Sequence, residues 1–368
     1  MKRVLVLNYE FPPLGGGAGN ATYYLLKEFA KYPDLEIDLV TSSVDTFRVE
    51  KFAGNITIHF LNIGKRGNLH YQTNQKLLMY SWKSYWYSKK LMEEKEYDLC
   101  HAFFGIPCGY VAMMLRLPYI VSLRGSDVPF YNKRFYWLDK LVFKRLSRKI
   151  WCSAQAVVAN SQKLKKLALE SAPKQSMSII PNGVDTEQFK PLPNGVLHKP
   201  LRLISTGRLI ERKGYRYLIE AISEMKDVEL SLVGDGNLRQ QLEELAKILS
   251  VKVKFLGSKR REEIVSLLQS ADVFILPSLN EGMSNSILEA MACGLPIIAT
   301  DTGGSSELIQ GNGVIVAKAD ADTLRKAIVQ LQSDPSLVGT MGRRSRELAE
   351  KMDWLLMSES YKKTYELA

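Results

Sequence analysis

Residues 281–296 read EGMSNSILEAMACGLP and carry two carboxylates, Glu281 and Glu289, separated by small and polar residues. The apolar run at 272–277 comes before them and predicts a buried strand. A strand, a polar loop and a helix start form the usual ligand-binding corner of an open α/β sheet. Because carboxylates only accept hydrogen bonds, this pair suits a ligand rich in hydroxyls, such as a sugar and a ribose.

The same segment also has a purely structural interpretation. Ser286 and Glu289 have the spacing of a capping box, in which Ser286 caps a helix and Glu289 bonds back to its start. In that case Glu281 and Gly282 form an ordinary turn. The rest of the sequence decides between the two interpretations.

Composition describes a globular chain with a basic surface. The 368 residues suffice for two or three domains, and 46% of them are hydrophobic. The formal net charge of +11 favours nucleic acid, anionic lipid or phosphate-bearing substrates, or else marks a merely soluble basic surface.

Cysteine spacing and hydropathy indicate a cytoplasmic protein. Neither CxxC nor metal-ligand spacing relates Cys100, Cys108, Cys152 and Cys293, so we expect reduced thiols. The apolar run after Met1 is too short for a signal peptide, and Arg116 and Pro118 interrupt the apolar segment at 111–121. We therefore expect no segment that spans a bilayer.

Short apolar runs alternate with helical patterns along the whole chain. In the first half we expect strands at 4–8, 37–41, 56–60, 98–100, 119–123 and 156–160, with a helix from about Asn20. After a Pro- and Gly-rich stretch at 190–200, we expect strands at 201–206, 229–233, 253–256, 273–276, 297–299 and 314–316. This pattern predicts two doubly wound α/β domains with a ligand-binding cleft between them.

Two cations follow the first strand of the second half. Arg208 ends the sequence Thr-Gly-Arg, and Lys213 lies five residues later, before a helix. A guanidinium fork and an ammonium near a helix start would grip a diphosphate, although such cations are also common on surface loops. Gly234 ends the next strand, where it either permits close approach of a ligand or makes a tight turn.

A glycine run lies between the first strand and its helix. The amides of Gly15, Gly16 and Gly17 could face a phosphate or a sugar. The run does not fit G-x-G-x-x-G, because Asn20 stands at the last glycine position. This counts against a dinucleotide cofactor.

Together these residues resemble family 4 of the retaining glycosyltransferases, which have the two-domain GT-B architecture. The resemblance covers nearly the whole chain, and its most specific part is Glu281-x7-Glu289 with the tail that ends at Pro296. The other matching segments are 15–17, Asn160-Ser161, 180–185, Gly207-Arg208, Lys213-Gly214, 234–236, Gly303-Gly304 and Glu307.

The resemblance implies two α/β, Rossmann-like domains with separate roles. Residues 1–189 would form the acceptor side, with a final helix at about 353–368 packed back on them, and 190–352 would bind the nucleotide sugar. Arg208 and Lys213 would hold the donor diphosphate, Glu281 the transferred sugar and Glu289 the ribose. The remaining expected donor-binding residues are Gly15, Gly16, Gly17, Gly234, Ser258, Met283, Ser284 and Asn285.

One position departs from the family pattern, which often has His-Gly-x-Asp after a strand of the first domain. Here residues 124–127 read Arg-Gly-Ser-Asp, so Arg124 could instead stabilise developing phosphate charge. His101 is a second candidate, although a lone histidine is more often structural. The expected catalytic set is Glu281, Arg124, His101 and Asp127.

The implied reaction moves a hexosyl unit from a nucleotide-diphosphate sugar to a glycan or lipid-linked acceptor, with retained configuration. It would serve the synthesis of cell-surface polysaccharide or glycolipid, and UDP-sugar is favoured over GDP-sugar. The Asp-x-Asp match at Asp320 and Asp322 lies at an expected helix start and is interpreted as a cap, so we expect no metal.

Two other functions stay open at this point. A sugar-nucleotide epimerase has the same architecture, and it would alter the donor with no acceptor present. A nucleic-acid-binding protein is suggested by charge alone, without an RNA-binding signature or zinc spacing, so no nucleic-acid partner is expected.

A basic, aromatic stretch at 131–151 suggests peripheral contact with the inner face of the cytoplasmic membrane. Its cations, opposed by Asp139 alone, are Lys133, Arg134, Lys140, Lys144, Arg145, Arg148 and Lys149. At helical spacing it also carries Phe135, Leu138, Leu141, Val142, Leu146 and Ile150. The stretch could lie on anionic lipid, or it could pack on the sheet as an ordinary amphipathic helix. Trp82 and Trp86 favour the first interpretation.

Overall fold

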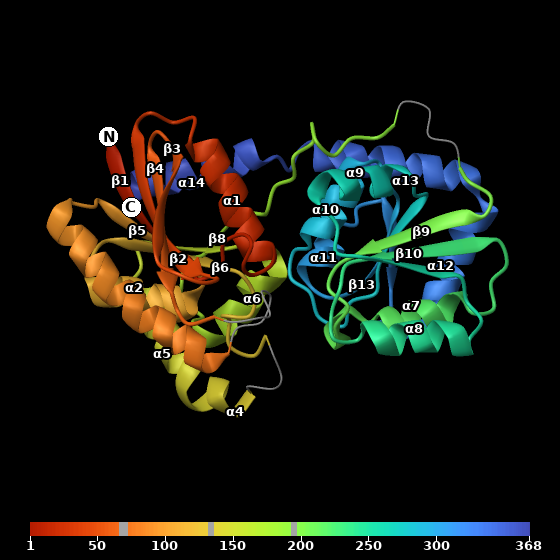
Figure 1. Ribbon diagram of the computed structural model, residues 1–368, viewed down its shortest axis with the longest axis horizontal. Helices are drawn as coiled ribbons and strands as arrows, with labels where there is room; N and C mark the ends of the chain where they lie inside the picture. The colour runs from red at the N-terminus through yellow and green to blue at the C-terminus, as the bar shows by residue number, and fades with distance from the viewer. Residues whose placement is uncertain (66–72, 132–135, 193–196) are drawn as a thin grey trace. The chain divides into compact units, whose positions relative to one another are not determined.

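The computed structural model describes residues 1–65, 73–131, 136–192 and 197–368. They divide into two compact units, each a sheet covered by helices (Figure 1). Unit 1 consists of Met1–Asn182 and Trp354–Ala368, and unit 2 is Gly183–Asp353. The division follows Asn182 and not residue 189, because the amide of Val184 bonds to the carbonyl of Met352 at 2.8 Å and Phe189 is buried in the core of unit 2.

The sheet of unit 1 has eight strands among the described residues, in the order β3-β4-β2-β1-β5-β6-β7-β8. All neighbouring strands are parallel except β3 and β4. Their bounds are β1 Lys2–Leu7, β2 Leu35–Ser43, β3 Arg48–Ala53, β4 Ile56–Asn62, β5 Leu99–Phe103, β6 Tyr119–Leu123, β7 Ala156–Ala159 and β8 Ser178–Ile179.

Helices cover both faces of this sheet. They are α1 Gly17–Phe29, α2 Asn74–Glu94, α3 Tyr110–Leu115, α4 Tyr136–Leu138, α5 Lys144–Cys152, α6 Gln162–Ser171 and α14 Trp354–Leu367. The last helix returns to unit 1 and packs along α1, where the rings of Tyr24 and Trp354 stack with centroids 5.0 Å apart. On the opposite face lie α2 and α5, together with a π-helical turn at Gly105–Gly109 (Figure 1).

Unit 2 has a fully parallel sheet with the described strand order β11-β10-β9-β12-β13-β14. The strands are β9 Leu201–Thr206, β10 Val228–Val233, β11 Val253–Gly257, β12 Val273–Leu276, β13 Ile297–Thr300 and β14 Gly313–Val316. The order reverses between β9 and β12, which is the topological switch point of a doubly wound sheet.

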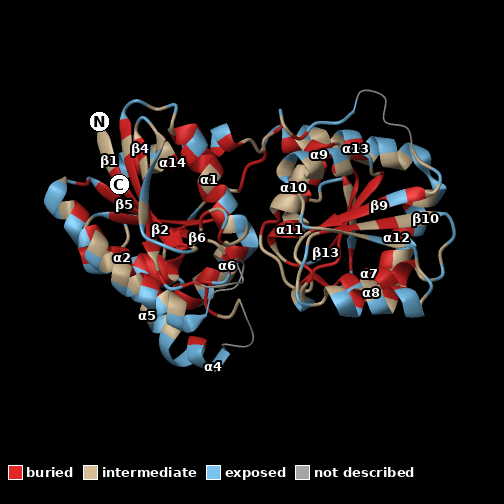
Figure 2. Ribbon diagram, viewed as in Figure 1, coloured by how far each residue is buried: buried red, intermediate tan, exposed pale blue. Residues whose placement is uncertain are grey.

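Two hydrophobic cores enclose the sheet of unit 2, one on each face (Figure 2). The helices are α7 Tyr215–Ile222, α8 Arg239–Ile248, α9 Arg261–Gln269, α10 Asn285–Ala292, α11 Gly304–Glu307, α12 Ala321–Ser333 and α13 Pro335–Ala349. Side chains of α7, α8 and α12 fill one core, and those of α9 and α10 fill the other. Burial on both faces explains why the inner strands β12 and β13 read as apolar runs in the sequence.

The predicted two-domain α/β fold is confirmed, with three local differences. Strands β3 and β8 were not predicted, because β3 is an edge strand with three charged residues among its six and β8 has only two residues. Helix α1 begins at Gly17, earlier than the predicted Asn20, because the amide of Asn20 already bonds to the carbonyl of Gly16 at 3.1 Å. Across the described ranges, no helix is both long and apolar enough to cross a bilayer.

A buried carboxylate joins three elements of unit 1 and makes its stability depend on pH. Asp38 of β2 is 1% exposed, and its oxygens lie 2.7 Å from His59 Nε2, 2.7 Å from Lys95 Nζ and 2.8 Å from the hydroxyl of Tyr97. Burial alone would raise the pKa of Asp38, but these partners outweigh it and lower the pKa to about 2.

We therefore expect Asp38→Asn to lower the free energy of unfolding by about 2 kcal/mol at pH 7. A carboxylate with a lowered pKa contributes stability above its unfolded pKa, and this contribution is lost as the pH falls through the folded pKa. Measured by urea unfolding, the difference in the free energy of unfolding between variant and wild type should be roughly half as large at pH 3 as at pH 7. Glu244→Gln, at an exposed site, is the control, and an equal loss at both pH values would contradict the assignment.

Candidate functional site

The candidate site of unit 2 lies at the carboxyl edge of its sheet, around the switch point between β9 and β12. Two loops meet there, one between β9 and α7 and the other between β12 and α10. Of the predicted residues, Arg208 and Lys213 lie on the first loop and Glu281 on the second. The structure thus brings the cations and the first carboxylate to one place.

Gly214 fixes how closely the two loops approach. Its φ is +65°, and a Cβ at this position would lie 2.2 Å from the carbonyl oxygen of Pro277. The amide of Leu279 also donates to the carbonyl of Arg212 at 2.7 Å. Only a residue without a side chain fits this contact, so glycine is required for the loops to meet.

Lys213 and Glu281 form an ion pair across the two loops. The side chains are 10% and 14% exposed, so water screens this pair weakly. Burial raises the pKa of Glu281, but the charges of Lys213, Arg212 and Arg208 more than offset this and hold the pKa below its usual value. Glu281 is therefore ionised at neutral pH and acts as a hydrogen-bond acceptor.

The start of α10 differs from the capping-box interpretation. The helix begins at Asn285, with Ser284 at the N-cap position, so Ser286 lies inside the first turn and caps nothing. The hydroxyls of Ser284 and Ser286 bond to each other at 2.9 Å. This leaves Glu289 without a capping role.

Glu289 instead faces the N-terminal end of α9. Its carboxylate lies 3.4 Å from Arg261, whose Nε donates to Gln188 at 2.9 Å. Burial raises the pKa of Glu289, and the charge of Arg261 opposes this in part. Sequence reasoning missed Arg261 as a partner, although its place after β11 puts it at the same sheet edge.

The remaining predicted donor-binding residues of unit 2 also lie at this edge. Gly234 follows β10, and a Cβ there would lie 2.1 Å from the carbonyl of Gly207, so close backbone packing requires this glycine. Ser258 is exposed directly after β11, whereas Met283 and Ser284 are buried in the loop before α10. Asn285 is the first residue of α10.

The Asp-x-Asp match has the predicted capping role. Asp320 is the N-cap of α12, and its side chain accepts bonds from the amides of Asp322 and Thr323 at 3.0 and 3.1 Å. Asp322 pairs with Arg325 at 3.1 Å.

In unit 1 the glycine run is close to an acidic side chain that the sequence analysis did not single out. The carboxylate of Glu10 accepts a bond from the amide of Gly16 at 3.2 Å. Gly15 has φ +91°, and its missing Cβ would clash with Glu10 at 2.6 Å. Gly17 begins α1. The amide of Gly16 therefore already has an anionic partner from the protein itself.

His101 lies in the interior of unit 1. It is 0% exposed, its Nδ1 lies 2.6 Å from the hydroxyl of Tyr365 and its Nε2 lies 2.7 Å from Ser122 Oγ. Burial, with a smaller contribution from Arg124, lowers the pKa of His101 well below its usual value. With both ring nitrogens bonded inside the protein, His101 has a structural role that joins β5, β6 and α14, and the expected contact with substrate is not supported.

Arg124 lies at the carboxyl end of β6 and is held by three elements. Its guanidinium donates to Asn182 at 2.9 Å and to Tyr361 of α14 at 3.3 Å, and it lies 4.6 Å from the ring centre of Phe103. It is half-buried, so it can present charge at the sheet edge.

Asp127 holds the backbone beside Arg124. It is 8% exposed, and its oxygens accept bonds from the amides of Arg124 and Gly125 at 2.9 Å and of Gly105 at 2.7 Å. Burial raises the pKa of Asp127, while these amides oppose the rise. Such a carboxylate positions Arg124, and the structure gives it no contact that requires a catalytic role.

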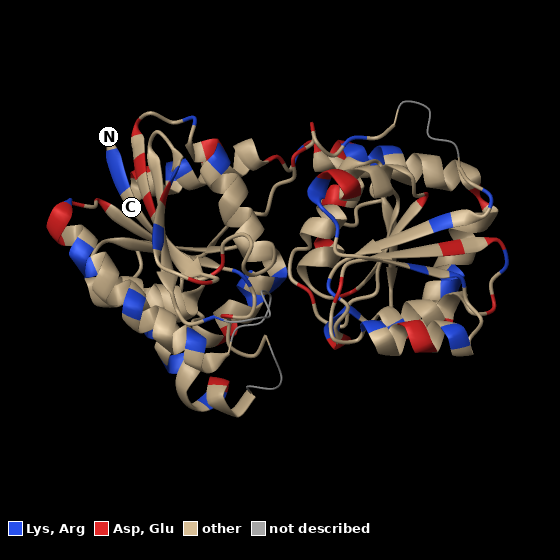
Figure 3. Cartoon of the chain, viewed as in Figure 1, with Lys and Arg blue, Asp and Glu red and all other residues tan. Residues whose placement is uncertain are grey.

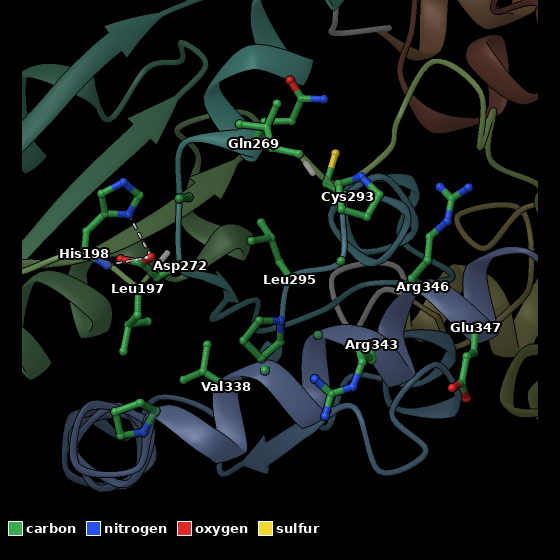
Figure 4. Close-up of a pocket in the computed structure, with 18 residues that line it drawn as sticks. Leu197, His198, Gln269, Asp272, Cys293, Leu295, Val338, Arg343, Arg346 and Glu347 are labelled. Carbon is green, nitrogen blue, oxygen red and sulfur yellow. Dashed lines mark hydrogen bonds and ion pairs between the residues drawn. The ribbon is translucent and has the colours of Figure 1, made fainter. Parts of the chain in front are cut away.

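A separate cavity of about 520 Å³ opens in unit 2 (Figure 4), and its lining residues do not include Arg208, Lys213, Glu281 or Glu289. It is lined by the segments that precede β12 and β13, with Asp272 and Leu295, and by Arg343 of α13. Asp272 there bonds to His198 Nδ1 at 2.9 Å. Because the cavity lies at the amino edge of the sheet, and ligands of such sheets bind at the carboxyl edge, we assign the site to the latter.

Known proteins resemble this chain in both sequence and structure. The family model described as glycosyltransferase family 4 matches residues 15–188, and that described as glycosyl transferases group 1 matches residues 200–334. An uncharacterized glycosyltransferase of Methanocaldococcus jannaschii is 26% identical over 99% of this chain and 98% of its own length. The putative teichuronic acid biosynthesis glycosyltransferase TuaC of Bacillus subtilis is 30% identical over 67% of this chain and 64% of its own length.

Solved structures show the same fold. Sucrose-phosphate synthase from Thermosynechococcus elongatus has a TM-score of 0.87 at 22% identity and covers 100% of this chain and 98% of its own. Anabaena HepE in complex with UDP-glucose has a TM-score of 0.76 at 20% identity, with 100% of both chains covered. Matches to family models in both units, joined to this fold, show that the chain belongs to glycosyltransferase family 4, the group 1 glycosyltransferases of GT-B architecture.

Proposed function

We propose that this enzyme transfers a hexosyl unit from a nucleotide-diphosphate sugar, with UDP favoured over GDP, to a glycan or lipid-linked acceptor in polysaccharide or glycolipid synthesis. The observation that carries the proposal is the group of cations around Glu281 at the switch point of unit 2. The names of relatives support the acceptor class, since they include glycosyltransferases of teichuronic acid and amylovoran biosynthesis.

The chemistry of the transfer matches these charges. When the bond between sugar and diphosphate breaks, negative charge grows on the diphosphate and positive charge on the sugar. Arg208 and Lys213 would stabilise the diphosphate more strongly in the transition state than in the bound donor, which lowers the barrier. The ionised Glu281 would accept hydrogen bonds from sugar hydroxyls, and Glu289 from the ribose.

Lys213 can bond to Glu281 and to the donor diphosphate at the same time. An ammonium has three donors, and its ion pair with Glu281 uses one of them. A diphosphate oxygen would take another donor, so the pair would link the leaving group to the carboxylate that holds the sugar.

Two finer points belong to the same proposal. Retention of configuration is proposed from the resemblance to retaining members of the family. Metal independence is proposed because the cations of the protein would neutralise the diphosphate. In addition, Asp320 caps α12 and Asp322 pairs with Arg325, so both aspartates of the Asp-x-Asp match have partners in the protein.

Nucleotide binding tests the site directly. A nucleoside diphosphate at a hundred times its dissociation constant should stabilise the protein by about 2.7 kcal/mol, which a thermal-shift assay detects. Arg208→Ala removes a charged donor and should weaken binding about ten- to a hundredfold. Arg216→Ala, an exposed arginine on α7, is the matched control. If both variants bind UDP and GDP like the wild type, the assignment of the diphosphate to Arg208 is wrong.

Chelation tests metal independence. We expect donor turnover to be unchanged in excess EDTA, because Arg208 and Lys213 supply the charge that a divalent cation would supply elsewhere. A metal-dependent transferase in the same buffer shows that the chelator is effective. Complete loss of activity, restored by manganese, would refute the prediction.

The stereochemistry can be followed by NMR. With an α-linked donor, we expect the first transferred or released sugar to be the α anomer, before mutarotation. A β anomer would exclude retention. A change of the donor sugar itself without release of the nucleotide would instead indicate an epimerase.

A further inference from the structure

Three of the five tryptophans are exposed on the surface of unit 1. Trp82, Trp86 and Trp137 are 64%, 58% and 69% exposed, whereas Trp151 and Trp354 are buried. Large apolar side chains that gather on a surface usually mark an interaction site. All three exposed tryptophans lie on two helical segments of this unit, α2 and the stretch at 136–152.

Helix α2 has one face in the core and one in solvent. Tyr80, Ser84, Ser88 and Leu91 are buried against the sheet. The opposite face carries the exposed residues Leu78, Met79, Trp82 and Trp86, at spacings that keep them on one side of the helix. An outer face this apolar is unusual for a helix that already has its core contacts.

The second segment, at 136–152, has one part that packs on the sheet and one part that is exposed. Its C-terminal part packs on the sheet, where Ser147, Ile150 and Trp151 are buried. Its N-terminal part is exposed and apolar, with Tyr136, Trp137, Leu138, Leu141 and Val142 each at least 48% exposed. Lys133, Arg134 and Phe135 lie outside the described residues.

Cations surround this apolar surface. Lys140 Nζ lies 5.6 Å from the ring centre of Trp137 and Lys144 Nζ lies 5.9 Å from that of Phe130. Arg145, Arg148 and Lys149 are exposed on α5, and Lys89 and Lys90 on α2. Figure 3 shows the basic residues along both helices. The acid of the segment, Asp139, is buried and accepts a bond from the amide of Phe130 at 2.8 Å.

From these observations we propose that unit 1 binds an anionic membrane through the exposed apolar face of these two segments, which we call the lipid-binding surface. We define that surface as the exposed apolar residues Leu78, Met79, Trp82, Trp86, Tyr136, Trp137, Leu138, Leu141 and Val142. Tryptophan and tyrosine rings settle at the level of the lipid headgroups, aliphatic side chains enter the acyl boundary, and the flanking lysines and arginines attract anionic headgroups.

The lipid-binding surface lies toward the carboxyl edge of the sheet of unit 1. Lys76 and Lys83 of α2 donate at 2.6 Å to the carbonyls of Gly64 and Asn62, just after and at the end of β4. The bond from Phe130 to Asp139 ties the second segment to the loop that carries Arg124. A membrane bound here would present a lipid-linked acceptor near that edge. This last point rests on the proposed function, whereas membrane binding itself does not.

Intrinsic fluorescence provides a direct experiment, because the exposed tryptophans all belong to this surface. Vesicles of phosphatidylglycerol should shift the emission of the full chain to shorter wavelength and reduce its quenching by acrylamide. Vesicles of phosphatidylcholine should do so at least tenfold more weakly, and high salt should reverse the effect. Equal binding to both lipids, or no binding to either at low salt, would overturn the proposal.

Variants distinguish binding through this surface from nonspecific adsorption of the protein to vesicles. Trp82→Gln with Trp86→Gln, and Leu141→Gln with Val142→Gln, should each lower cosedimentation with phosphatidylglycerol vesicles at least tenfold. Ile248→Gln with Val329→Gln changes two exposed apolar residues of unit 2 and should have no effect. Unchanged vesicle binding by both surface variants would refute the assignment. It would also be refuted if the wild type bound no vesicles but formed a dimer in light scattering, and the surface variants dissociated that dimer.

A further readout keeps this test independent of the enzyme's chemistry. Both variants of the lipid-binding surface should retain the wild-type melting temperature and the nucleotide-induced thermal shift, because their altered side chains are exposed and lie outside unit 2. A variant that loses membrane binding but keeps the nucleotide-induced shift has a defective lipid-binding surface and an intact donor site. The membrane proposal can therefore fail or hold independently of the proposed function.

Discussion

The candidate site of unit 2 depends on the close approach of two loops at the switch point of the sheet. Gly214 makes this approach possible, because any side chain there would collide with the carbonyl of Pro277. The approach brings Lys213 against Glu281, where burial keeps their attraction strong and neighbouring cations keep the carboxylate ionised. The carboxylate of this ion pair would then accept hydrogen bonds from a sugar, and its ammonium would donate hydrogen bonds to a diphosphate.

The fold, and the placement of Arg208, Lys213 and Glu281 at one edge of the sheet of unit 2, could be predicted from sequence because both rest on local patterns. Buried parallel strands appear as apolar runs, and their carboxyl ends share one edge, so residues far apart in sequence could be placed together. The partners at that edge could not be predicted. Arg261 reaches Glu289 from another helix. In unit 1, the carboxylate of Glu10 likewise reaches the amide of Gly16 through the folding of the loop between them, which no local sequence pattern indicates.

Unit 1 shows why single polar residues are hard to interpret from sequence. His101 and Arg124 both follow the register of the sheet, yet one is enclosed and the other reaches the edge. The difference comes from their places along the strands, because His101 lies in the middle of β5 and Arg124 follows the last residue of β6. Helix α14, more than two hundred residues away in sequence, bonds to both through Tyr365 and Tyr361. The C-terminal helix therefore completes the environment of Arg124 as well as the core of unit 1.

A crystal structure with a bound UDP-sugar tests the central claim most directly. The account predicts the diphosphate within hydrogen-bond distance of Arg208 and Lys213, with sugar and ribose hydroxyls on Glu281 and Glu289. Density for the ligand in the cavity beside Asp272 and Arg343, at the amino edge of the same sheet, with the carboxyl edge left empty, would contradict it.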